Sequence, residues 1–226
     1  MLGYIIIAGI FSVIGMIISG RLRSKFAHYS RVPIRSGMSG AEIAETMLRH
    51  YNIRDVKIVE GQGFLTDHYN PMTKTVSLSS DVYNGRSVSA AAVASHECGH
   101  AVQHANSYAM LRFRSAIVPI VNIASGLQQY LLLFALGAFG IGSSDFLLMI
   151  TIGVFSVTTL FSLVTLPVEF DASRRALAWL DQSGVARGAE YDGAKDALWW
   201  AAMTYVAAAL SALVTLLYLL MRLNND

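Results

Sequence analysis

The stretch SVSAAAVASHECGHAVQ, residues 87–103, decides the fold and the chemistry expected of this chain. It contains His96 and His100, with Glu97 directly after the first histidine. On an α-helix, positions i and i+4 lie on the same face, so both imidazoles can reach one metal ion. Glu97 lies beside that face, where a carboxylate can take a proton from an attacking water. The pattern therefore predicts a hydrolytic zinc site carried on a helix.

The residues around the motif favour that helix. Residues 87–95 are mostly small and compatible with a helix, and either Ser87 or Ser89 could cap its start. Gly99 is a poor residue inside a helix, so we expect another backbone segment to pass close to it. Cys98 points away from the face that carries the two histidines, and we expect it to pack rather than to bind metal.

The composition indicates a membrane protein. The chain is 54% hydrophobic and only 14% charged, a charged share well below that of soluble domains. Four stretches are long and apolar enough to span a bilayer, namely residues 2–19, 116–139, 146–166 and 197–221. We therefore predict a mainly α integral membrane protein with about four transmembrane helices. Residues 20–115 and 167–196 lie outside the predicted spans.

Basic residues predict the orientation of the chain. Of its 17 Lys and Arg residues, twelve fall within 21–115 and four within 167–196, and only Arg222 falls on the opposite side. The positive-inside rule makes the basic side cytoplasmic and places the N-terminus outside. We predict a multi-pass protein of the plasma membrane with its active site on the cytoplasmic side. The net charge of +2 is explained by loops that face anionic lipid and gives no reason to expect nucleic acid as a partner.

The segment between the first span and the motif has the pattern of a helix followed by strands. Ser39 with Glu42 forms a capping-box pattern at the start of a helix over 39–48. Residues 56–59 and 75–78 alternate as strands do. The strand before the motif helix could offer its edge to an extended substrate, or it could only cover the core. A further helix is expected to begin at 107–108 and to run into the second span.

Catalytic zinc usually has three protein ligands and one open position. His104 lies four residues after His100, but it is about 12 Å from His96 along the helix at about 1.5 Å per residue. That separation is too large for one ion, so we expect His104 to support the site from outside or to lie on the helix surface.

A glutamate from another helix is the better candidate for the third ligand. Glu169 follows Pro167 where the third predicted span ends, and proline suits the first turn of a new helix. That helix is expected to end near residues 183–184. Glu169 could instead be a solvated carboxylate or the partner of Arg174 or Arg175. Asp171 is the fallback ligand, although it projects from the opposite side of the same helix.

The chain resembles the YugP-type neutral zinc membrane metallopeptidases in HECGHAVQ at 96–103, EFDAS at 169–173, DHYNP at 67–71 and VSLS at 76–79. It is more distantly similar to the HtpX-type membrane proteases, which also place spans between the HExxH motif and the glutamate ligand. The resemblance implies a zincin-like (gluzincin) α+β catalytic part with His96, His100 and Glu169 as ligands of one Zn²⁺, and Glu97 as the general base. The HtpX-type pattern has an aspartate where this chain has Ser173, which shares a face with Glu169 and could take over part of its hydrogen bonding.

These expectations describe an endopeptidase acting on peptides or proteins, membrane proteins among them, at the cytosolic membrane surface. The residue that stabilises the oxyanion is left open among His68, Tyr83, Tyr191 and Arg174. The main alternative is a membrane scaffold or binding protein with a structural zinc site and no peptidase activity. A transporter is disfavoured because the predicted spans contain no acidic or basic residue of the kind that couples ions. The sequence does not indicate an oligomeric state.

Overall fold

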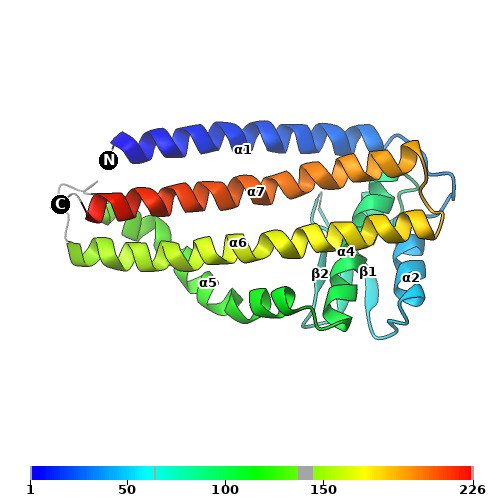
Figure 1. Ribbon diagram of the computed structural model, residues 1–226. Helices are drawn as coiled ribbons and strands as arrows, with labels where there is room; N and C mark the ends of the chain where they lie inside the picture. Colours follow the sequence, from blue (N-terminus) through cyan, green and yellow to red (C-terminus); the bar gives the residue numbers. More distant parts are fainter. Residues whose placement is uncertain (1, 64, 137–144, 225–226) are drawn as a thin grey trace. The chain divides into compact units, whose positions relative to one another are not determined.

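The computed structural model describes residues 2–63, 65–136 and 145–224, and most of them are helical (Figure 1). The elements in chain order are α1 (Leu2–Tyr29), α2 (Gly40–His50), β1 (Lys57–Gly61), β2 (His68–Asn70), β3 (Thr75–Ser79), α3 (Ser80–Tyr83), α4 (Val88–Ala105), α5 (Ala109–Ala135), α6 (Asp145–Gln182) and α7 (Ala189–Leu223). The chain forms two compact units. The first comprises Met1–Ile18, Arg112–Pro167 and Met203–Asp226, and the second comprises Ser19–Leu111 and Val168–Ala202.

Among the residues that the structure describes, four helices are long and apolar enough to cross a membrane, namely α1, α5, α6 and α7. In the first unit, large apolar side chains of α1 are exposed, among them Ile5, Ile10 and Met16. A continuous exposed apolar surface is unfavourable in water and is the normal state of a helix in lipid. The mostly helical architecture predicted from composition is therefore confirmed, and these helices are candidates for membrane spans. The span boundaries stay predictions, and the predicted end of the second span lies partly outside the described residues.

Threonine hydroxyls join helices within the first unit. Thr159 of α6 donates to the backbone oxygen of Ala212 in α7 at 3.3 Å, and Thr151 donates to Leu131 of α5 at 3.4 Å. Hydroxyls of this kind are common between helices in lipid because they pair with backbone oxygens without adding charge. The amide side chains of Asn122 and Gln129 on α5, in contrast, are exposed.

The second unit is built around α4, which packs against α2 and beside the sheet (Figure 1). Alanines at 90, 91, 92 and 94 are buried and allow this close packing. The sheet has the order β1-β3-β2, with β1 parallel and β2 antiparallel to β3. Val76 and Leu78 of β3 point into the core. The result is a small α+β unit whose most buried helix carries the HExxH motif.

Local signals in the sequence predicted several of these elements. Ser39 caps α2 as expected: its hydroxyl accepts from the Glu42 backbone N–H at 3.3 Å, and the Glu42 carboxylate accepts from the Ser39 N–H at 2.7 Å. Ser87, one of the two proposed caps, accepts from the Ala90 N–H at 3.2 Å and begins α4. The two strands and the helix beginning after 107–108 are also confirmed. The short elements β2 and α3 were not predicted.

The suggestion that the strand before α4 could offer its edge to a substrate is wrong. That strand is β3, the central strand of the sheet: β1 pairs with it along its whole length, and β2 pairs with Thr75–Ser77 on the other side. The short strand β2 lies at the outer edge of the sheet, and its antiparallel register pairs His68 with Ser77 and Asn70 with Thr75. Among the strands that the structure describes, the fully open edges belong to β1 and β2.

The prediction that a new helix begins at Pro167 is also wrong. Helix α6 runs without interruption from Asp145 to Gln182 with Pro167 inside it. A proline removes one backbone hydrogen bond, but membrane helices tolerate this because neighbouring groups satisfy the oxygen that is set free. Glu169 therefore lies in the interior of a long helix. The predicted end of that helix is confirmed, since Gly184 follows it with a φ of +73°.

Candidate metal centre

Helix α4 is held tightly enough to position its two histidines. The Ser95 hydroxyl donates to the Ala91 oxygen at 2.7 Å, and the buried Cys98 thiol donates to the Ala44 oxygen of α2 at 3.6 Å. Cys98 therefore packs, as predicted. Gly99 lies against α6: a Cβ at this position would be 2.6 Å from the backbone oxygen of Ala172. The close passage of a second backbone, expected from Gly99, is confirmed.

That second backbone brings Glu169 to the two histidines. The candidate ligand atoms of His96, His100 and Glu169 all lie within 4.8 Å of one another. Glu169 Oε2 is 3.3 Å from His96 Nε2 and 3.6 Å from His100 Nε2. The two imidazole rings are nearly perpendicular, with their centroids 4.8 Å apart. The structure therefore brings together the three residues that the sequence predicted as ligands. Their function as ligands stays a prediction.

Burial strengthens the electrostatic interactions among the residues of this cluster. Glu169 is 3% exposed and His100 is 8% exposed. Burial by itself lowers the pKa of His100, but the hydrogen bond and the charge of Glu169 outweigh it and raise the pKa above its ordinary value. The charge of Glu97, the next largest contribution, acts in the same direction. A divalent cation placed among these groups would replace the protons that otherwise balance the carboxylates.

The outer nitrogens of both histidines have partners. The Ser173 hydroxyl is hydrogen-bonded to His96 Nδ1 at 3.1 Å, so Ser173 takes the supporting position that the sequence suggested for it. His100 Nδ1 is 3.0 Å from Oε1 of Gln103, a fully buried residue that the sequence analysis did not place near the site. The available signal was a large amide three residues after a ligand, on the helix face that turns inward. In both histidines, Nε2 is the nitrogen that faces Glu169.

Asp171 lies outside the ligand cluster but is connected to it. Its carboxylate accepts from Gln103 Nε2 at 2.9 Å and is paired with Arg174 and with Arg175, the latter at 2.5 Å. These arginines therefore pair with Asp171, and the alternative that they pair with Glu169 is not supported. The fallback role of Asp171 as a direct ligand is likewise not supported by its position.

His104 lies one turn beyond His100 and is not part of the cluster found among the described residues. Its Nδ1 is hydrogen-bonded to the Tyr69 hydroxyl of β2 at 2.7 Å. Burial, with a smaller contribution from the charge of Asp55, raises the pKa of Tyr69 to about 12. This hydrogen bond links β2 to the C-terminal end of α4.

A groove of about 320 Å³ lies next to Ser173. Tyr191 and Arg174 line it, together with the apolar side chains of Phe170 and Trp199. The other two residues considered for oxyanion stabilisation lie elsewhere. The exposed ring of His68 is hydrogen-bonded to the Thr66 oxygen at 2.8 Å, and Tyr83 packs against the hydrophobic core.

Comparison with known proteins agrees with this geometry. Residues 4–224 match the family described as "Putative neutral zinc metallopeptidase", and the chain belongs to this family. Among curated proteins, the chain is 45% identical over 205 residues to the "Putative membrane protease YugP" of Bacillus subtilis (strain 168). That alignment covers 91% of this chain and 89% of the relative. No solved structure was found to match, so the zincin-like fold stays a prediction.

Proposed function

We propose that this chain is a membrane-embedded, zinc-dependent endopeptidase that hydrolyses peptide bonds of membrane or unfolded proteins at the cytosolic face. The observation that carries the proposal is the convergence of two imidazole nitrogens and one carboxylate oxygen in a buried cluster. The zinc metallopeptidase family and the membrane protease relative support the same chemistry.

The donor set of the cluster fits zinc. Imidazole nitrogen and carboxylate oxygen are common zinc donors, and two histidines with one glutamate leave a fourth position open, as catalytic sites require. Ser173 and Gln103 hold the outer nitrogens of His96 and His100, which leaves Nε2 of each ring directed at the shared centre. We therefore propose His96, His100 and Glu169 as the residues that hold one zinc ion per chain.

In this proposal Glu97 is the general base. When bound, zinc supplies an activated water and polarises the scissile carbonyl. The Glu97 carboxylate, buried on α4 beside both histidines, accepts the proton of the attacking water and later passes it to the leaving amine. The groove next to Ser173 favours Tyr191 or Arg174 as the group that stabilises the oxyanion.

The proposed location of the reaction follows from the sequence around Glu169. Glu169 lies three residues after the predicted end of the third span at 166, and sixteen of the 17 basic residues belong to the predicted cytoplasmic side. A site at this position would meet cytosolic loops of membrane proteins and unfolded chains close to the bilayer. Those are the substrates that we propose.

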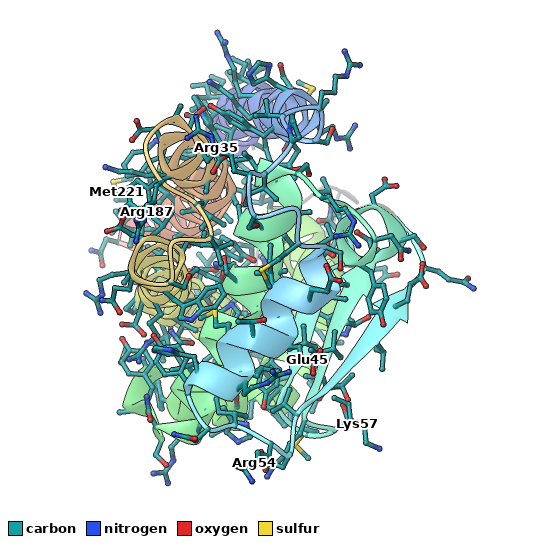
Figure 2. All side chains as sticks on the ribbon, turned by 90° about the vertical axis from the view of Figure 1, so that its right-hand side faces the viewer. Arg35, Glu45, Arg54, Lys57, Arg187 and Met221 are labelled. Carbon is teal, nitrogen blue, oxygen red and sulfur yellow. The ribbon has the colours of Figure 1, made fainter. Side chains whose placement is uncertain are left out.

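The decisive experiment compares cleavage of an unfolded reporter protein by the detergent-purified wild type and by Glu97→Gln. We expect activity that is lost with a chelator, restored by zinc, and lower by about 10²- to 10⁴-fold in Glu97→Gln because the general base is missing. Zinc content should be the same in both proteins, since Glu97 is not a proposed ligand. The matched control is Glu45→Gln on the exposed face of α2 (Figure 2), which should keep full activity.

The outcome also separates this proposal from a membrane scaffold with a structural zinc. A scaffold predicts that zinc is bound and that removing it lowers only the thermal stability, with no cleavage by either protein. Equal cleavage by the wild type and Glu97→Gln would exclude Glu97 as the base. Absence of bound zinc in the wild type would remove the proposed site altogether.

A further inference from the structure

Gln103 occupies an unusual position for an amide. It is fully buried on α4, and its two ends contact different groups: Oε1 faces His100 Nδ1 at 3.0 Å, while Nε2 faces two oxygens of α6. Those oxygens are the backbone carbonyl of Val168 at 2.8 Å and the Asp171 carboxylate at 2.9 Å. A buried amide must satisfy both ends, so its orientation is determined by what surrounds it.

The Val168 carbonyl decides that orientation. A backbone carbonyl can only accept a hydrogen bond, so the end of Gln103 that faces it must be the NH₂ group. The opposite end is then the carbonyl oxygen, which can only accept, and His100 Nδ1 must carry a hydrogen to donate to it. The neutral imidazole of His100 is therefore the Nδ1–H tautomer, whose Nε2 lone pair faces Glu169 Oε2 at 3.6 Å.

Asp171 fixes the far side of Gln103. Its carboxylate is 4% exposed, accepts from Gln103 Nε2, and is held by Arg174 and Arg175 one turn along α6. Arg175 also lies over the ring of Tyr108 at 5.9 Å, which restrains the guanidinium further. The Asp171 carboxylate is thus held by two arginines of its own helix, in addition to its contact with Gln103 of α4.

We infer that Gln103 and Asp171 are positioning residues that set the tautomer and ring orientation of His100 for metal binding. Both helices that supply the cluster take part, since Gln103 lies on α4 with His100, and Asp171 and Val168 lie on α6 with Glu169. The inference rests on the proposed zinc site, and it adds a network on the outer side of His100 that corresponds to Ser173 on the outer side of His96.

The test measures two properties of Gln103→Leu, which replaces the amide by an apolar side chain of similar size. The first is zinc affinity, measured by competition with a chromogenic chelator, which we expect to fall about 10- to 100-fold. The second is the tautomer of His100 in the zinc-free protein, read from ¹⁵N shifts of histidine-labelled samples in detergent at a pH high enough for the ring to be neutral. The wild type should show Nδ1–H at His100, and Gln103→Leu should show a mixture of tautomers.

Further variants separate positioning from simple packing. Asp171→Asn should lower the affinity less than Gln103→Leu. The matched control is Gln129→Leu on the exposed face of α5, which should change neither property.

Each result has a distinct meaning. Unchanged zinc affinity in Gln103→Leu, or an Nε2–H tautomer in the wild type, would overturn the positioning role. A wild type that binds no zinc would refute the proposed function, while the tautomer measurement on zinc-free protein would still decide whether Gln103 orients His100.

Discussion

The roles of the two histidines become clear only when the partners of both ring nitrogens are known. His96 and His100 were identified by their spacing alone, but spacing could not show which ring nitrogen is available to a metal. The partners of the outer nitrogens, Ser173 and Gln103, supply that information. Ser173 was predictable because it lies one helical turn from Glu169. Gln103 was not placed near the site because its contacts depend on a helix that is 65 residues away in the sequence.

Tyr69 gives a prediction at the same scale. Its pKa is raised to about 12 by burial and by the charge of Asp55, so the folded protein resists ionisation of this phenol. The stability gained in this way is complete below the ordinary pKa of 10.0 and is lost as the pH rises through about 12. The melting temperature of the wild type should therefore fall between pH 10 and pH 12. Tyr69→Phe should remove part of that fall.

The comparison for Tyr69 uses a second tyrosine of the chain. Tyr130→Phe changes an exposed side chain of α5 in the other unit and should leave the alkaline transition as it is in the wild type. If Tyr69→Phe and the wild type lose stability to the same extent over this range, the proposed contribution of the buried phenol is refuted. The stability of Tyr69→Phe at pH 7 also reports on the hydrogen bond to His104, a neutral bond of about 1 kcal/mol.

At the scale of elements, the contact between α4 and α6 is the one on which the site depends. Gly99 has no side chain, and the Ala172 oxygen lies only 2.6 Å from the place where a Cβ would be. Gly99→Ala should force the helices apart and lower the stability by about 1–3 kcal/mol. Zinc affinity should fall too, because Glu169 lies three residues before Ala172 on the displaced helix. Thermal unfolding in detergent, with and without zinc, measures both effects.

A glycine in an open position provides the comparison for Gly99→Ala. Gly126 on α5 has nothing within 4 Å of the place where a Cβ would be added. Alanine in a helix interior is preferred over glycine by about 0.5–1 kcal/mol, so Gly126→Ala should be neutral or stabilising. Destabilisation of the same size in both variants would mean that the close approach to Ala172 is not what Gly99 provides.

Elements with strong local signals were predictable from the sequence, and those that depend on long-range pairing were not. The capping box at Ser39 and the small-residue run before His96 are local, and both helices begin where expected. The three-residue strand β2 exists because β3 pairs with it, and nothing in its own residues requires a strand. Pro167 was misread because the rule that proline begins or ends a helix holds less strictly for long apolar helices.

For the whole molecule, the orientation in the membrane is the largest prediction that awaits a test. The distribution of basic residues predicts that the second unit is cytoplasmic and that both chain ends are outside. In a Cys98→Ala background, a cysteine at Asn224 should react with a membrane-impermeant maleimide in intact cells. A cysteine at Gln182, an exposed and neutral position at the end of α6, should react only after the cells are permeabilised. The reverse labelling pattern would place the site outside the cell.

The division of the second unit into residues 19–111 and 168–202 has a consequence for how the protein is made. A ribosome releases His96 and His100 well before Glu169, and two predicted spans must be synthesised in between. A nascent chain therefore contains a histidine pair without its carboxylate, and core residues such as Trp179 and Leu180 are missing at the same stage. In the proposed enzyme, hydrolytic activity can begin only after Glu169, which follows the third predicted span, has been synthesised and has joined the two histidines.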